Sequence, residues 1–197
     1  MANTIHLIRH GHHALLGRQL CGRMSGVALD ELGHQQMQRL AEIIAPIPSV
    51  IQSSPQQRAR DSAAILAVRF NLGVEIAPAV DEIDVGGWTA LTFAELNTDP
   101  LWHQWNSARS TGAPPNGENI HTLERRVVQH LERVCDSDAE TIAIVSHAEP
   151  IRAALLHYTG ASLDDFLSID VDVASVSTLT MDATGIRVSR INQQVPA

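Results

Sequence analysis

The chain has 197 residues, of which 44% are hydrophobic and 18% are charged, and its formal net charge is −8. This length suits one domain with one hydrophobic core, and the composition is that of a globular protein rather than of a disordered chain. The net charge argues against a nucleic-acid binder, which needs a basic surface, but leaves room for a small cationic pocket that takes one anionic substrate.

Two further features narrow the class of protein. No apolar run is long enough to cross a bilayer, and the first residues lack the basic and apolar pattern of a signal peptide. A cytoplasmic protein without a membrane partner is therefore expected, and both a monomer and a homodimer stay open. Cys21 and Cys135 match no metal-binding or redox spacing, which indicates ordinary thiols.

Strands and helices alternate in the first 80 residues. The apolar pattern predicts strands over residues 4–9, 49–53 and 74–77, the last at a sheet edge, and helices over residues 31–45 and 55–70. Ser54 and Pro55 form a helix-start signal, because a hydroxyl caps the first N–H groups and proline suits the first helical position.

Residues 80–117 have a different character. They hold several glycines and prolines and all three tryptophans, Trp88, Trp102 and Trp105. Thr92 and Glu95 have the spacing of a capping box, which predicts a short helix from about Phe93. We interpret this segment as an insertion or lid over the main sheet, within a single domain that spans residues 1–197.

The last 80 residues return to alternating elements. The pattern predicts an amphipathic helix over residues 120–134, a buried strand over 141–146, a helix over 149–160 and a hairpin over 175–191 with its turn at 182–185. Because strands and helices alternate along most of the chain, we expect an α/β fold, a three-layer sandwich with a mostly parallel central sheet flanked by helices.

Chemically reactive side chains follow three of the predicted strands. The first strand runs into Arg9 and His10, the second is followed by Arg58 early in its helix, and the strand over 141–146 ends at His147. Ligands of open parallel sheets bind outside the carboxyl ends of the strands, so these side chains are expected at one edge. A planar guanidinium group can donate two parallel hydrogen bonds to phosphate oxygens, and helix N-termini attract anions. Two arginines beside helix N-termini are therefore expected to bind a dianionic phosphate.

Four stretches of the sequence resemble the motifs of one family. They are LIRHG (residues 7–11), SSPQQRARDSA (53–63), DEIDVGGW (81–88) and VSHAEPIRA (145–153). The sequence resembles the histidine phosphatase superfamily, also called the phosphoglycerate mutase-like family, in which such motifs occur in this order. The resemblance covers most of the chain and is greatest to the phosphatase branch.

The resemblance implies catalytic roles for five residues. His10 would be the nucleophile that forms a phosphohistidine intermediate, and Arg9, Arg58 and His147 would bind the phosphate oxygens. Glu82 would protonate the leaving oxygen and then accept a proton from the attacking water. No metal or other cofactor is implied, because the arginines neutralise the phosphate charge.

The resemblance is weaker around the substrate. Family members often carry Thr or Ser where this chain has His13, so His13 either replaces that hydroxyl at the substrate or is a half-exposed loop histidine. Cys21, Gly22 and Ala148 stand where family members line the pocket, which implies substrate contact. Glu118 matches a glutamate of the phosphatase branch, and we expect it to cap the helix that follows.

The histidine-rich stretch HLIRHGHH, residues 6–13, admits a second interpretation as a metal site. Zinc sites usually add cysteine or carboxylate ligands at defined spacing, and none is obvious here. Strand alternation places His6 on the same face as His10, which indicates a structural His6 below the pocket. His12 is expected to be exposed.

Three functions fit these residues. The favoured one is a metal-independent acid or neutral phosphatase that hydrolyses a small phosphorylated substrate. A cofactor-dependent phosphoglycerate mutase shares the residues, but mutases typically have longer insertions around the pocket, and the segment over 80–117 adds little positive charge beyond Arg109. A non-catalytic phosphate-binding module would not need the full set of five catalytic residues.

Overall fold

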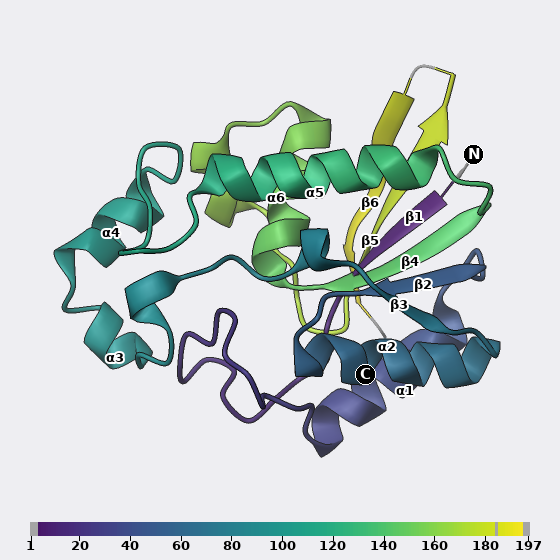
Figure 1. The fold of residues 1–197 in the computed structure, drawn as a ribbon, viewed down its shortest axis with the longest axis horizontal. Coiled ribbons are helices and arrows are strands. Elements are labelled where there is room, and N and C mark those ends of the chain that lie inside the picture. Colours follow the sequence, from purple (N-terminus) through teal and green to yellow (C-terminus); the bar gives the residue numbers. More distant parts are fainter. Residues whose placement is uncertain (1–3, 184, 195–197) are drawn as a thin grey trace.

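A computed structural model describes residues 4–183 and 185–194. Within these ranges six strands form one sheet in the order β3-β2-β4-β1-β5-β6 (Figure 1). The parallel strands are β1 (Thr4–Arg9), β2 (Val50–Ser53), β3 (Val74–Ile76) and β4 (Thr141–Ser146). β5 (Val176–Asp182) and β6 (Gly185–Gln193) add an antiparallel hairpin. The mostly parallel sheet and the edge position of β3 are confirmed, while the predicted turn includes Thr184, which lies outside the described residues.

Two pairs of helices cover the two faces of the sheet (Figure 1). α1 (Glu31–Ile43) and α2 (Gln57–Phe70) pack on one face, and α5 (Ile120–Cys135) and α6 (Ala148–Thr159) pack on the other. This arrangement confirms the predicted three-layer α/β sandwich. No helix in the described ranges is both long and apolar enough to cross a bilayer.

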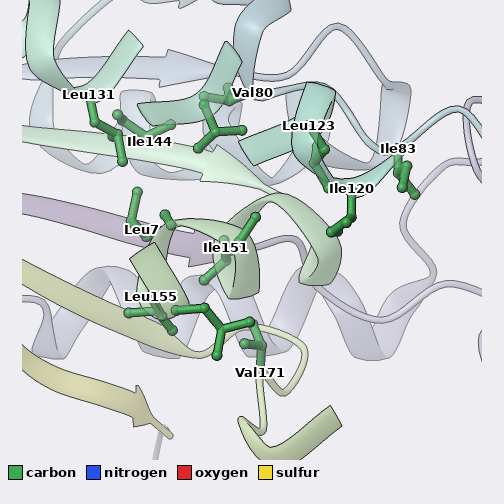
Figure 2. Packing of buried hydrophobic residues seen from close by; sticks show 14 of the residues in the cluster. Leu7, Val80, Ile83, Ile120, Leu123, Leu131, Ile144, Ile151, Leu155 and Val171 are labelled. Carbon is green, nitrogen blue, oxygen red and sulfur yellow. The ribbon is translucent and has the colours of Figure 1, made fainter. Parts of the chain in front are cut away.

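The larger core cluster lies between the sheet and the α5–α6 pair. Leu7 of β1 and Ile144 of β4 face Leu123 of α5 and Ile151 of α6 in this cluster (Figure 2). Ile8, the neighbour of Leu7, packs in the second cluster with α1 and α2, because successive strand residues point to opposite faces. Each fully buried aliphatic side chain contributes roughly 2 kcal/mol to stability, so both faces of β1 hold it in place.

Several helix boundaries differ from the sequence predictions by one or two residues. α1 ends at Ile43, because the backbone of Ile44 is extended. α2 begins at Gln57 rather than at Pro55, because the Ser54 hydroxyl accepts the Gln56 N–H in a turn instead of capping a helix there. α6 begins one residue earlier than predicted, at Ala148.

The segment between β3 and α5 lies at one end of the sheet, on the left of Figure 1. It contains α3 (Phe93–Leu96) and α4 (Pro100–Ser107), and the predicted capping box before α3 is present. The ring of Trp88 lies 5.4 Å from those of Trp102 and Trp105, measured between centroids, and its indole N–H donates to Asp99 at 2.8 Å. Trp88 and Trp105 belong to the larger core cluster and Trp102 packs against it, so the segment is joined to the main core.

Candidate active site

A cavity of about 290 Å³ opens where β1, β2 and β4 end. Arg9 and His10, which follow β1, line it together with Arg58 from the first turn of α2 and Glu82 from the loop after β3. His147, which follows β4, is fully buried beside them, and its ring centroid lies 5.1 Å from that of His10. The predicted convergence of these segments at one sheet edge is thus present.

The surroundings of His10 define which ring nitrogen is free. Its Nδ1 lies 2.8 Å from the carbonyl oxygen of Gly11, to which it donates, so Nε2 carries the lone pair. The Nε–H of Arg58 points at this Nε2 over 3.3 Å. Burial, followed by the positive charges of Arg58 and Arg9, lowers the pKa of His10 well below its ordinary value. His10 is therefore a neutral imidazole at pH 7 with an unprotonated Nε2.

The loop that carries His10 is held by α1 and α2. Gly11 donates its N–H to the Ser62 hydroxyl at 3.1 Å, and Ser62 donates to the carbonyl of Arg58 one turn earlier in α2. A Cβ on Gly11 would lie 2.6 Å from the carbonyl oxygen of Gly33 in α1, so only glycine permits this approach. The loop of His10 and the residue Arg58 are thus both tied to α2 through Ser62.

The two arginines keep unpaired donors at the cavity. Arg58 donates from Nη2 to the carbonyl of Gly22 at 2.8 Å, and Arg9 donates from Nη1 to the carbonyl of Val171 at 2.6 Å. Nη1 of Arg58 and Nε of Arg9 are buried and have no hydrogen-bond partner in the described part of the chain. Buried N–H groups are rarely left unpaired, so these donors favour an anionic ligand.

Glu82 is held with one carboxylate oxygen toward His147. Its Oε1 accepts the N–H of Ile83 at 2.9 Å, and its Oε2 lies 3.8 Å from His147 Nδ1. Burial, followed by the negative charge of Glu149, raises the pKa of Glu82 to about 7. Glu82 therefore holds a proton in a large fraction of molecules at neutral pH, as a general acid requires.

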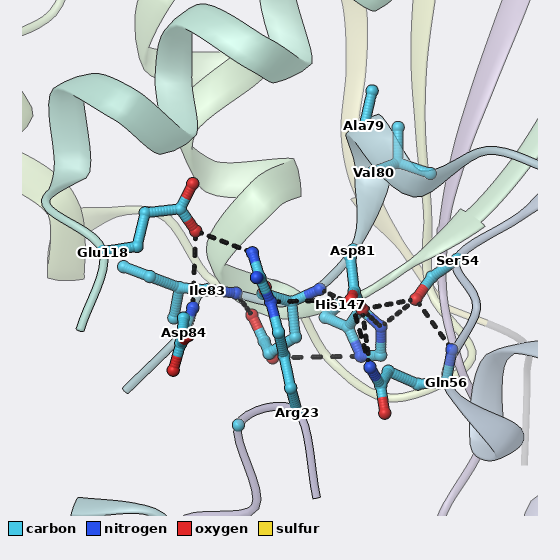
Figure 3. Close-up of polar contacts among 12 residues, drawn as sticks. Arg23, Ser54, Gln56, Ala79, Val80, Asp81, Ile83, Asp84, Glu118 and His147 are labelled. Carbon is cyan, nitrogen blue, oxygen red and sulfur yellow. Dashed lines mark hydrogen bonds and ion pairs between the residues drawn. The ribbon is translucent and has the colours of Figure 1, made fainter. Parts of the chain in front are cut away.

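His147 belongs to a wider polar network with Ser54 and Asp81, which Figure 3 shows. His147 Nε2 lies 2.7 Å from the Ser54 hydroxyl, and that hydroxyl donates to Asp81 Oδ1 at 3.0 Å. Asp81 stands directly before Glu82 in the sequence, but neither it nor Ser54 was assigned a role at the site from the sequence. The sequence does not indicate the hydrogen bonds of Ser54 to Asp81 and His147, because local patterns mark Ser54 only as a helix cap.

The four predicted substrate-binding residues all line the cavity. His13 is buried with its ring centroid 5.3 Å from that of His10, so the half-exposed alternative for His13 is wrong. Burial, then Arg58 and Arg9, lower the pKa of His13 to about 4. The other three are Cys21, Gly22 and Ala148.

The remaining histidines of the HLIRHGHH stretch point elsewhere. His6 is buried between the carbonyl of Pro46 at 2.9 Å and the hydroxyl of Thr178 at 3.2 Å, in keeping with its structural interpretation. The prediction that His12 is exposed is wrong, because its Nδ1 pairs with Asp30 at 2.6 Å and its side chain is half-buried. Within the described ranges, no three His, Cys, Asp or Glu side chains gather as metal ligands.

Glu118 does not cap α5, contrary to expectation. The Asn119 side chain caps the helix by accepting the N–H of Thr122, which leaves the Glu118 carboxylate free for Arg126 at 2.7 Å and Arg23 at 3.0 Å. Both arginines also donate to the carbonyl oxygen of Glu82, at 3.1 and 2.8 Å. Glu118 therefore holds the two arginines that position the backbone of the Glu82 loop.

A second charged group lines another part of the cavity. Arg109 is buried over the Trp105 ring, 3.4 Å from its centroid, and donates to Glu149 at 2.7 Å. Arg152 lies one turn after Glu149 in α6, and its Nη1 pairs with the other carboxylate oxygen of Glu149 at 3.5 Å. Sequence patterns did not reveal this group, because Arg109 and Glu149 are 40 residues apart in the chain.

Fold and site together define an α/β protein with a cavity at the ends of its parallel strands that Arg9, His10 and Arg58 line. The model of the histidine phosphatase superfamily (branch 1) matches residues 5–194. The chain belongs to this superfamily, and the resemblance inferred from the four motifs is confirmed.

Named relatives agree with this placement. A bifunctional protein of Mycobacterium tuberculosis is 30% identical over 192 residues, which are 95% of this chain and 53% of that protein, so the chain spans about half the length of this curated relative. Phosphoserine phosphatase 1 of Hydrogenobacter thermophilus is 29% identical over 178 residues, covering 87% of this chain and 84% of the relative. The solved structure of Bacillus stearothermophilus YhfR has a TM-score of 0.89 at 25% identity and 96% coverage of each chain.

Proposed function

We propose that this chain is a metal-independent phosphatase that hydrolyses a small phosphate monoester through a phosphohistidine formed on His10. The observation that carries the proposal is the neutral His10, whose Nε2 lone pair lies at the cavity beside two arginines with unpaired donors. Membership of the superfamily and relatives named as phosphatases support the same reaction class.

In the first step His10 Nε2 attacks phosphorus and the bond to the leaving oxygen breaks. Arg9 and Arg58 stabilise the charge on the phosphoryl oxygens, and Glu82 gives its proton to the leaving oxygen. In the second step Glu82 accepts a proton from water, the water oxygen bonds to phosphorus, and the bond to Nε2 breaks. Phosphate leaves, and His10 and Glu82 return to their starting states.

The cavity supports a small anionic substrate. Its volume of about 290 Å³ is at the lower end for ligand pockets, and His13, Cys21, Gly22 and Ala148 are placed to contact the ester group. Phosphoserine is the first substrate to test, since one relative is named for it. A cytoplasmic location, the absence of nucleic-acid partners and the oligomeric state stay predictions.

Hydrolysis is favoured over the phosphoglycerate mutase alternative for an electrostatic reason. A mutase must hold a bisphosphate, which needs a second set of free cations. The further arginines of the cavity, Arg109 and Arg152, both pair with Glu149. Adding 3-phosphoglycerate with its bisphosphate cofactor separates the two, because only a mutase releases 2-phosphoglycerate.

Trapping the intermediate tests the proposal. Brief incubation with a radiolabelled aryl phosphate, followed by denaturation, should leave acid-labile, base-stable label on the protein. His10→Ala should abolish both the label and phosphate release, whereas His12→Ala, two residues away and paired with Asp30, should be labelled like the wild type. Undiminished label in His10→Ala would show that the phosphoryl group is carried elsewhere.

A further inference from the structure

A buried hydrogen-bonded chain leads from Asp81 through Ser54 to His147 (Figure 3). Asp81 Oδ1 also accepts from the Glu82 N–H at 2.8 Å and from the Gln56 side chain at 3.0 Å, so it acts as an acceptor. The Ser54 hydroxyl has a single proton, which it donates to Asp81, and it accepts the Gln56 N–H at 3.2 Å. His147 Nε2 is therefore the donor to Ser54, which fixes the direction of the whole chain.

This direction limits what His147 can offer to a substrate. A neutral imidazole has one N–H, and here it lies on Nε2, so Nδ1 carries a lone pair. Nδ1 is buried without a hydrogen-bond partner in the described residues and lies on the side of Glu82, 3.8 Å from Oε2. A lone pair directed at a phosphoryl oxygen is repelled, so His147 contributes to phosphate binding only when Nδ1 takes a proton.

The charges around His147 decide when that proton is held. The groups that face it from the neighbouring elements are Arg9, His10, Arg58, Asp81, Glu82 and Arg126. Burial, then the positive charges among them, lower the pKa of His147, so it is neutral before a ligand binds. A bound dianion offsets the positive charges of the arginines, which removes part of what disfavours a charged His147. The Asp81 carboxylate, whose Oδ1 lies 3.9 Å from His147 Nε2, then stabilises the imidazolium form of His147.

We propose that Asp81, acting through Ser54, is a positioning residue that keeps His147 Nε2–H turned away from the substrate and stabilises a proton on Nδ1 when a phosphate dianion binds. The inference rests on the proposed function, and it adds that substrate binding takes up a proton from solution. Asp81 touches neither the substrate nor the reacting atoms; it acts on them through His147.

Sulfate is a suitable probe, because it remains a dianion across the pH range of interest. The background is Glu82→Gln, because the pKa of Glu82 is raised to about 7 and its carboxyl group would otherwise exchange protons in the same pH range. Calorimetry at pH 7 in buffers of different ionisation enthalpy should show uptake of about one proton per sulfate bound. Nitrogen NMR of the histidine rings, assigned with His147→Gln, should show His147 changing from a neutral ring to an imidazolium.

Asp81→Asn in this background should reduce the proton uptake and weaken sulfate binding at pH 7 by about tenfold, equivalent to one pKa unit on His147. Ser54→Ala should act in the same direction, and it tests the chain independently if one variant folds poorly. Asp84→Asn is the matched control, since Asp84 lies in the same loop and its carboxylate accepts from Gly86 instead. It should behave like the background protein.

Proton uptake and His147 signals that are unchanged by both Asp81→Asn and Ser54→Ala would overturn the inference, as would sulfate binding without any protonation of His147. Absence of sulfate binding would overturn it as well. These readouts need no turnover. A wild-type protein that shows the His147 change but releases no phosphate from any ester would therefore contradict the proposed function alone.

Discussion

At the scale of single residues, Glu82 shows how burial can keep a carboxyl group protonated near neutral pH. The carboxyl group is shielded from water and faces Glu149, and the pKa of Glu82 is raised to about 7 for these two reasons. A carboxylic acid that is still protonated near neutral pH can donate its proton to a leaving oxygen as the bond to phosphorus breaks. His147 and His10 show the opposite shift, because burial disfavours their charged forms.

Glu82→Gln should slow hydrolysis of an alkyl phosphate by about 100-fold or more, the usual contribution of a general acid. An aryl phosphate should be slowed much less, because its leaving oxygen is stable without a proton. Measuring kcat for both esters checks this. Glu75→Gln, on the exposed edge strand β3, is the control, and equal slowing of the two esters by Glu82→Gln would remove its role as acid.

At the scale of elements, the site depends on two loops that hold each other. The loop with Glu82 continues to Gly86, whose φ of 51° lies in the left-handed region. A Cβ at Gly86 would lie 2.2 Å from the carbonyl oxygen of Pro115 in the loop before α5. Gly87 donates its N–H to the same oxygen at 2.7 Å, so the loops are closely joined at this point.

Gly86→Ala should therefore lower the free energy of unfolding by about 1–3 kcal/mol, the cost of a residue held in an unfavourable backbone region. It should also reduce kcat, because relief of the clash moves the segment that carries Glu82. Urea unfolding and ester hydrolysis measure the two effects. Gly73→Ala is the matched control, since nothing lies within 4 Å of its added Cβ; equal stability of the two variants would refute the prediction.

At the scale of the whole molecule, buried histidines make stability depend on pH. Burial lowers the pKa of five described histidines, namely His6, His10, His13, His130 and His147, and it raises the pKa of Glu82. Below about pH 6.5 these histidines are protonated in the unfolded state but stay neutral in the folded state. The unfolded state therefore binds more protons, and lowering the pH favours unfolding. Glu82 has the opposite sign, because its folded form binds the extra proton between about pH 4.5 and 7, but it is one group against five.

The protein should consequently melt at a lower temperature at pH 5 than at pH 7, with a difference of more than about 3 °C, since roughly 1 kcal/mol corresponds to 2–4 °C for a chain of this size. Thermal unfolding at constant ionic strength measures it. A melting temperature at pH 5 equal to or above that at pH 7 would contradict this balance of charges.

The apolar periodicity was sufficient to predict the α/β sandwich, and the strand ends were sufficient to predict that Arg9, His10, Arg58 and His147 meet at one edge, whereas Glu82 and the catalytic roles followed from the resemblance to the family motifs. Strand alternation sorts side chains onto two faces, and parallel strands bring their carboxyl ends to one edge, so Arg9, His10, Arg58 and His147 meet without any knowledge of distances. These are consequences of local geometry repeated along the chain, which is why the sequence alone contains them.

Only the tertiary structure revealed the hydrogen-bond partners and the protonation states of these groups. Ser54 lies 27 residues from Asp81 and 93 from His147, and Arg109 lies 40 from Glu149, and no local pattern records such pairs. The buried state of His13, the partners of Glu118 and the proton on Glu82 likewise depend on which charges approach and how much water is excluded. Distance and burial set protonation in this site, and both arise only when distant segments pack together.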